Sequence, residues 1–157
     1  MGSLCTKNNH IEPDNINLPI PIPIPQLKIK NILLVDDIKA TEILFKSFID
    51  IYIDNPNINF KYVSSGEAAI KLIQQGNNYD IIFMDIIMGQ PPQLDGYQTT
   101  QKIRDMGFSN LILGLTGMVD DISKAKGIKA GINDFCAKPI KWDDLIDLVK
   151  SKNYLWH

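Results

Sequence analysis

The sequence is poor in the residues that build zinc sites and disulfide frameworks, with two cysteines and two histidines among its 157 residues. Cys5 and Cys136 lie near opposite ends of the chain and form no cluster with ligand spacing. Disulfide-rich frameworks belong to oxidising compartments, so their absence favours a reduced, intracellular setting. We expect a cytoplasmic protein, or a nuclear or membrane-anchored one if its source is a eukaryote.

The sequence also lacks a large charge excess and a long apolar run. Its formal net charge is -2, and because a nucleic-acid-binding face needs an excess of basic residues, no nucleic-acid partner is expected. No run reaches the roughly 20 apolar residues that span a bilayer, and the N-terminus lacks the pattern of a secretory signal. With 45% hydrophobic and 22% charged residues, the composition indicates one packed globular domain.

The first 27 residues read as a tail without a packed core. Residues 1–17 are polar and unpatterned, and the following stretch, LPIPIPIPQ, alternates proline with isoleucine. Proline at every second position excludes a central strand and favours polyproline II. The stretch is either a semi-rigid spacer or an extended arm whose isoleucines lie along one edge on the domain surface, which we favour. We expect the folded domain at 28–152 and a short C-terminal tail at 153–157.

The first six residues, MGSLCT, fit the N-myristoylation pattern, with Gly2 as acceptor and Thr6 in the favoured hydroxyl position. Cys5 could carry a palmitoyl chain, and stable anchoring takes two such signals. The alternative is a chance match or a cloning scar that begins Met-Gly-Ser. A membrane is therefore expected as a partner only if the N-terminus is acylated.

From residue 29 onward, short apolar runs alternate with segments of helical character. Strand-like runs are 29–37, 59–65, 79–85, 110–117 and 132–140, and helix-like segments are 41–53, 66–76, 96–107, 120–131 and 142–152. The first helix has apolar residues at helical spacing on Ile43, Leu44, Phe48 and Ile51. Five strand–helix rounds with continuous apolar strands predict an α/β fold, a parallel sheet covered by helices on both faces.

Chemically active side chains follow the predicted strands. Asp36 and Asp37 come after the first strand, Asp85 after the third, Thr116 after the fourth and Lys138 after the fifth. Ligands of open parallel sheets gather at this carboxyl edge. Three carboxylates repel one another unless a cation joins them, and Mg²⁺ prefers carboxylates, water and phosphate oxygens. With a lysine and a hydroxyl nearby, the set suits phosphoryl transfer, with Asp85 as the candidate nucleophile.

Each of these residues also has an ordinary structural interpretation. An Asp-Asp pair after a strand is often only a loop start and helix cap, Thr116 alone is typical of a turn, and a Lys-Pro pair is typical of a solvated loop. The functional interpretation is favoured because all of these residues occur together, in order, at the ends of the predicted strands.

These residues resemble the receiver (response-regulator) domain of two-component phosphorelays, the CheY-like superfamily. The resemblance covers about residues 29–151 and rests on ILLVDD, DIIFMDIIM with LDGYQTTQKIR, LILGLTG and AGINDFCAKPI. It implies a flavodoxin-like (βα)5 doubly wound sheet with strand order 2-1-3-4-5. It also implies that Asp85 is the phosphoacceptor and that Mg²⁺ is held by Asp36, Asp37, Asp85 and the backbone carbonyl of Ile87.

The resemblance assigns four further positions. Thr116 would hydrogen-bond the phosphoryl group, Lys138 would pair with it, Phe135 occupies the aromatic switch position, and Pro139 would follow a cis peptide bond. Phe135 could equally be a plain core residue. The implied partners are a histidine kinase or a histidine phosphotransfer protein, which would supply the phosphoryl group. The chain ends shortly after its last helix, so onward phosphotransfer or protein contact is expected as output.

Two departures from the family pattern stand beside the phosphoacceptor. The loop MGQPPQLDG is about three residues longer than usual, with Gly89 where proline is expected; this is either a tolerated insertion, which we favour, or an altered partner surface. Ile87 and Met118, two residues past Asp85 and Thr116, cannot orient an attacking water. Slow self-dephosphorylation is predicted.

The same residues argue against two other functions. Aspartate-nucleophile phosphatases favour a second aspartate two residues after the first, and the isoleucine at position 87 argues against that function. A pseudo-receiver that acts purely as an interaction scaffold would be expected to lack one of the site residues, and none is missing. The sequence specifies no partner kinase and no oligomeric state.

Overall fold

The computed structural model describes residues 29–53, 56–118 and 120–151. The predictions for the N-terminal tail, the proline-isoleucine stretch, Gly2 and Cys5, and the tail at 153–157 all lie outside these residues. Within the described part, no helix is both long and apolar enough to cross a bilayer.

Strands and helices alternate along the chain as predicted. The strands are β1 (Asn31–Val35), β2 (Asn59–Val63), β3 (Ile81–Asp85), β4 (Leu111–Thr116) and β5 (Asp134–Ala137). The helices are α1 (Lys39–Tyr52), α2 (Gly66–Gln74), α3 (Gly96–Asp105), α4 (Asp121–Ala130) and α5 (Trp142–Ser151). All strand pairs are parallel and the strand order is β2-β1-β3-β4-β5, which confirms the flavodoxin-like (βα)5 prediction.

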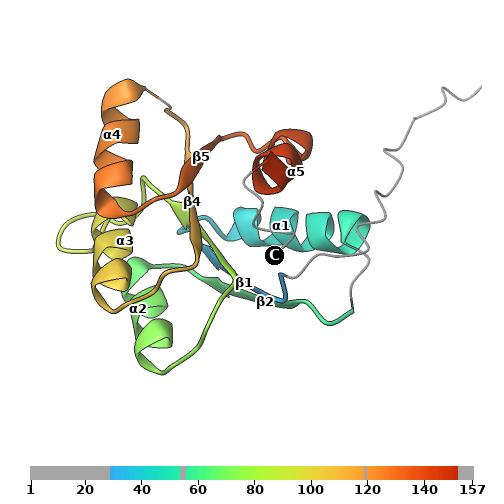
Figure 1. Ribbon diagram of the computed structural model, residues 1–157, viewed down its shortest axis with the longest axis horizontal. Helices are drawn as coiled ribbons and strands as arrows, with labels where there is room; N and C mark the ends of the chain where they lie inside the picture. Colours follow the sequence, from blue (N-terminus) through green and yellow to red (C-terminus); the bar gives the residue numbers. More distant parts are fainter. Residues whose placement is uncertain (1–28, 54–55, 119, 152–157) are drawn as a thin grey trace, which may run out of the picture.

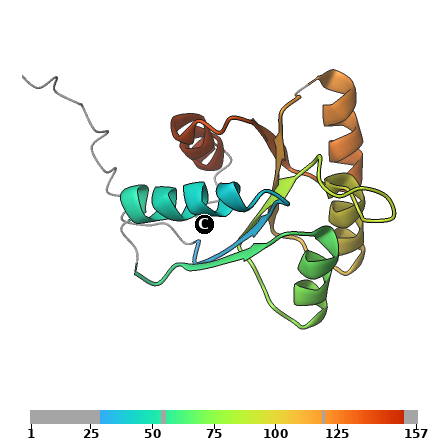
Figure 2. The same cartoon turned by 180° about the vertical axis from the view of Figure 1, so that it is seen from behind.

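The sheet lies between two layers of helices. Helices α1 and α5 cover one face, and α2, α3 and α4 cover the other (Figures 1 and 2). The three central strands are buried almost throughout, because each is an apolar run with side chains on both faces. Two apolar clusters result, one on each face of the sheet. This two-sided burial fixes the carboxyl edge, where the polar residues after each strand come together.

Helix α1 is confirmed, but its buried face is not the one that its apolar spacing suggested. Of the four apolar residues that indicated the helix, Phe48 is buried, whereas Ile43, Leu44 and Ile51 are exposed by 62%, 58% and 57%. Phe45 is buried in their place. Aromatic rings provide the larger burial, and they lie on the side of the helix that faces the sheet.

Trp142 anchors the start of α5 to α1. Its ring stacks on Phe48 with centroids 4.2 Å apart and meets Phe45 edge-on at 5.3 Å. Both α1 rings are buried, and Trp142 is partly buried against the same apolar cluster. The tryptophan therefore serves as a packing anchor between the two helices on this face of the sheet.

Candidate functional site

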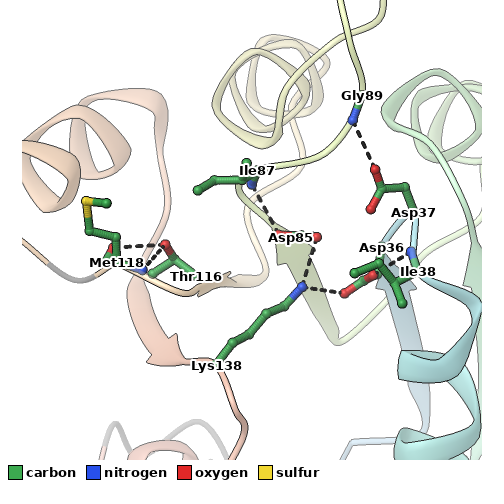
Figure 3. Close-up of polar contacts among 9 residues, drawn as sticks. All are labelled: Asp36, Asp37, Ile38, Asp85, Ile87, Gly89, Thr116, Met118 and Lys138. Atoms are coloured by element: carbon green, nitrogen blue, oxygen red, sulfur yellow. Dashed lines mark hydrogen bonds and ion pairs between the residues drawn. The ribbon is translucent and has the colours of Figure 1, made fainter.

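The acidic residues predicted at the carboxyl edge of the sheet do lie together. Asp36 and Asp37 follow β1, and Asp85 is the last residue of β3, the neighbouring strand. One carboxylate oxygen from each of the three lies within 4.8 Å of the others. We call Asp36, Asp37 and Asp85 the acidic cluster (Figure 3).

Lys138 reaches the acidic cluster from the end of β5. Its Nζ lies 2.8 Å from Asp36 Oδ2 and 2.9 Å from Asp85 Oδ2. The lysine thus bridges the two buried acids, whose side chains are sealed from solvent, while Asp37 stays exposed. A buried carboxylate needs such a partner, because an unpaired charge in the interior is strongly unfavourable.

One backbone amide donates to each of the three carboxylates. Ile38 N–H donates to Asp36 Oδ1 at 2.8 Å, Ile87 N–H donates to Asp85 Oδ1 at 3.1 Å, and Gly89 N–H donates to Asp37 Oδ2 at 3.3 Å. Each acid is therefore held by the loop that follows a strand. This contribution of the main chain has no signature in residue identity, and sequence reasoning missed it.

The charges of this site perturb one another. Burial raises the pKa of the Asp85 carboxyl above its ordinary value, although Lys138 acts in the opposite direction. Burial lowers the pKa of Lys138, but its hydrogen bonds to Asp36 and Asp85 and their negative charges outweigh this effect, so that its pKa is raised. The ammonium group is therefore firmly protonated, whereas the charge on Asp85 is held at a cost.

The donor set suits a hard divalent cation. Three carboxylates that converge within 4.8 Å offer oxygen ligands and carry more negative charge than Lys138 neutralises. No histidine or cysteine belongs to the group, which disfavours zinc. The cluster is an acidic triad typical of the magnesium sites of receiver domains. Ligation by the Ile87 carbonyl stays a prediction.

Thr116 ends β4 at the same edge and is buried. Its Oγ1 donates to the Met118 carbonyl at 2.8 Å and accepts from Met118 N–H at 3.1 Å, so the hydroxyl is engaged with its own loop (Figure 3). Ile87 and Met118 themselves are 70% and 62% exposed. Neither side chain has a polar atom that could hold a water in line, and the slow self-dephosphorylation inferred from them stays a prediction.

Phe135 fills a space that two glycines leave open. A Cβ on Gly127 of α4 would lie 2.2 Å from its Cζ, and a Cβ on Gly114 of β4 would lie 2.8 Å from its Cδ1. The ring is partly buried and packs against the apolar cluster on the α3 and α4 side. Phe135 therefore packs as a core residue in this conformation, and its role as a switch stays a prediction.

The lengthened loop after β3 is hydrogen-bonded to Asp37 of the acidic cluster and to helix α2. Besides the bond from Gly89 to Asp37, Leu94 N–H donates to Glu67 Oε1 of α2 at 2.9 Å. Gly89 has φ +70°, in the region that favours glycine. The Lys138–Pro139 bond is cis, as the resemblance implies, and the Pro91–Pro92 bond is cis as well.

The start of α3 packs directly against the end of β3. A Cβ at Gly96 would lie 2.2 Å from the Asp85 carbonyl oxygen and 2.7 Å from Ile86 Cα, so only glycine fits there. Asp95 closes a capping box with Gln98, in which side chain and backbone bond reciprocally. The cap and the close approach together fix the backbone that carries Asp85. The glycine was quoted in the family motif, but its contact role was not predicted.

Fold and site together define a doubly wound α/β protein with an acidic cluster at the edge where such sheets bind ligands. The family model for the response regulator receiver domain matches residues 32–150. The chain belongs to this family, which confirms the resemblance seen in the sequence, and it is accordingly a phosphoacceptor signalling module of the two-component type.

Similar proteins include a response regulator and a segment of a histidine kinase. The chain is 30% identical over 122 residues to two-component response regulator 24 of Arabidopsis thaliana, covering 78% of this chain and 83% of that protein. It is 34% identical over 137 residues to hybrid signal transduction histidine kinase B of Dictyostelium discoideum, where it covers 78% of this chain but 7% of the kinase.

A solved structure with the same fold contains a metal. It is the receiver domain of a sensor histidine kinase from Pseudomonas aeruginosa PAO1, with a magnesium ion coordinated in its active site cleft. The TM-score is 0.64 at 27% identity, and the match covers 78% of this chain and 95% of that one.

Proposed function

We propose that Asp85 accepts a phosphoryl group from a phosphohistidine and that the resulting acyl phosphate is the signal. The observation that carries this proposal is the placement of Asp85 beside two further acids and one lysine at the carboxyl edge of the sheet. A carboxylate oxygen of Asp85 would attack phosphorus, the P–N bond to the imidazole would break, and the imidazole would keep the electron pair and take up a proton.

The other residues of the site would support this step. Lys138 already contacts Asp85 Oδ2 at 2.9 Å, so its ammonium group is placed to neutralise charge on the phosphoryl oxygens. Thr116 would exchange its bond to the Met118 carbonyl for one to the phosphoryl group. Asp36, Asp37 and Asp85, with the Ile87 carbonyl, would hold Mg²⁺, which when bound neutralises the negative charge that gathers there.

We further propose that the donor is a histidine kinase or a histidine phosphotransfer protein, and that residues 28–152 form the receiver unit. The occurrence of a similar segment within a hybrid histidine kinase supports this donor class. Thr116 and Phe135 would couple phosphorylation to the surface: movement of Thr116 toward the phosphoryl group would let the Phe135 ring shift from its place beside Gly114 and Gly127.

Intact mass spectrometry tests the chemistry. The protein is incubated with acetyl phosphate and Mg²⁺, and the expected result is one phosphate-sized adduct that is absent from Asp85→Asn and lost on treatment with hydroxylamine, which cleaves acyl phosphates. Asp147→Asn, an exposed aspartate on α5, is the matched control and should label normally. An adduct on Asp85→Asn, or no adduct on the unchanged protein, would overturn the proposal. Turnover of small phosphoesters would favour the phosphatase instead.

A further inference from the structure

The lengthened loop after β3, residues 89–95, folds back on itself beside the acidic cluster. Gln93 N–H donates to the Gln90 carbonyl at 2.8 Å, and the Gln93 side-chain oxygen accepts from Gln90 N–H at 3.4 Å. The two ends of this turn lie in contact, because a Cβ at Gly89 would be 3.1 Å from both Gln93 Cβ and the Leu94 carbonyl oxygen. A shift of Leu94 would therefore also displace Gly89.

Glu67 of α2 holds the far end of this loop. Its Oε1 accepts from Leu94 N–H at 2.9 Å. This hydrogen bond lowers the pKa of the Glu67 carboxyl below its ordinary value, so that the group is ionised at neutral pH. Hydrogen bonds to an ionised acceptor are stronger than those between neutral groups. Glu67 also lies in the first turn of α2, where the helix dipole favours a negative charge.

The backbone that carries Glu67 belongs to a closely packed part of the molecule. Ser65 caps α2 by accepting from Ala68 N–H at 3.2 Å. Gly66 approaches Thr99 of α3 so closely that a Cβ would overlap the threonine hydroxyl, and Thr99 is buried. A side chain that extends from such a fixed helix end gives the loop a support that its own chain ends do not provide.

Asp37 is the member of the acidic cluster that most needs such support. Asp36 and Asp85 are buried and paired with Lys138, whereas Asp37 is exposed. Gly89 N–H donates to Asp37 Oδ2 at 3.3 Å. Because a carboxylate has about four lone-pair positions, this bond leaves room for a cation. A ligand whose orientation is fixed in advance loses less conformational freedom when the metal binds.

We propose that Glu67 is a positioning residue for the magnesium site. Through Leu94 it holds the loop in the conformation that directs Gly89 N–H at Asp37, and it thereby strengthens the binding of Mg²⁺. The last contact of this chain, from Gly89 to Asp37, is drawn in Figure 3. Glu67 acts through the loop and is no ligand itself. The inference rests on the proposed Mg²⁺ site, and it gives the lengthened loop a role as the connection between α2 and that site.

Amide NMR on the full chain, first without metal and then in a titration with MgCl₂, tests the inference. Glu67→Ala should shift the Gly89 amide signal before any metal is added. It should also raise the Kd for Mg²⁺ about three- to tenfold, less than the roughly 10- to 100-fold effect of losing a direct outer-shell partner. Glu67→Gln keeps an oxygen that can accept from Leu94 N–H, so it should restore most of the affinity. Gln74→Ala, an exposed change on the same helix, is the matched control and should alter neither quantity.

Three results would overturn the inference. Equal or tighter Mg²⁺ binding by Glu67→Ala would show that the loop does not position Asp37, and the proposed metal site would still stand. An equal loss of affinity in Glu67→Ala and Glu67→Gln would assign the effect to the missing charge alone. No saturable Mg²⁺ binding by the unchanged protein would refute the proposed metal site and this inference with it. Since Glu67 is exposed, both variants should fold, and unchanged amide signals from the central strands verify this.

Discussion

Replacing Asp85, the proposed phosphoacceptor, should make the metal-free protein more stable. Asp85→Asn keeps the shape of the side chain and an oxygen that can accept from Ile87 N–H. It removes the negative charge of a residue that is only 3% exposed. Lys138 would retain its ion pair with Asp36 at 2.8 Å, so the substitution leaves no buried charge without a partner.

The attraction and repulsion that the Asp85 charge experiences can be calculated from the distances. At an effective dielectric constant of 20, the attraction between Asp85 and Lys138 at 2.9 Å amounts to about 5.7 kcal/mol. Each repulsion between carboxylate oxygens that lie within 4.8 Å of one another amounts to at least about 3.5 kcal/mol. Repulsion from exposed Asp37 is partly screened, so the Coulomb terms nearly cancel. Loss of hydration, which costs several kcal/mol per buried ion, then decides the sign. We expect Asp85→Asn to raise the free energy of unfolding by about 1–2 kcal/mol, or Tm by about 3–8 °C.

The pH dependence follows from the raised pKa of Asp85. The folded state binds this proton more tightly than the unfolded state, so ionised Asp85 lowers stability at neutral pH. That penalty disappears as pH falls through the raised folded pKa, and it is absent below the unfolded value of 3.8. The stability difference between the variant and the unchanged protein should therefore be largest near pH 7 and should narrow on acidification.

Urea unfolding followed by circular dichroism measures the free energy of unfolding of both proteins, first with a chelator and then with Mg²⁺. Mg²⁺ at ten times its dissociation constant should stabilise the unchanged protein by about 1.4 kcal/mol and the variant less, so that the gap narrows or reverses. Asp147→Asn, an exposed position on α5, should change neither stability nor its response to Mg²⁺. The reasoning is refuted if metal-free Asp85→Asn is less stable at pH 7, or if its advantage is the same at low pH.

Three further outcomes are expected. Lys138→Met should destabilise the metal-free protein by about 3–5 kcal/mol, because two buried acids lose their cation; a smaller loss in Mg²⁺ than in chelator, by urea unfolding, is the check, and equal losses would contradict the argument. Gly127→Ala should cost about 1–3 kcal/mol, since the new Cβ meets Phe135 at 2.2 Å, and the added change Phe135→Leu should restore part of it; an uncoupled pair in that double-mutant cycle would contradict the packing. The acyl phosphate should outlast seconds in Mg²⁺ and decay faster in a protein with Ile87→Asp and Met118→Asn, as measured by intact mass, whereas decay within seconds in the unchanged protein would count against the role assigned to these two side chains.

The strand-end residues could be predicted from sequence because their position depends on a local rule. A parallel strand that is buried on both faces must end where a polar residue follows, and all such ends share one edge. The three carboxylates and Lys138 therefore follow from the order of apolar runs. The architecture followed for the same reason, since five alternations of strand and helix leave few arrangements of a doubly wound sheet.

The face of α1 could not be predicted in the same way. Periodicity identifies a helix when apolar residues recur every three or four positions, but α1 has two apolar faces, and a pattern does not say which one meets the sheet. The choice depends on Phe45 and Phe48, which pack with Trp142 from the far end of the chain. Such long-range contacts have no local signature, and the aliphatic residues Ile43, Leu44 and Ile51 were left outside.

The lengthened loop shows how a departure from a family pattern can alter a site through the main chain. Proline in place of Gly89 would have no N–H, whereas Gly89 donates to the Asp37 carboxylate at 3.3 Å. Its φ of +70° is also outside the range of proline, whose ring holds φ near -65°. The glycine and the insertion therefore belong together: the turn that accommodates the longer loop also aims a backbone donor at the one exposed member of the acidic cluster.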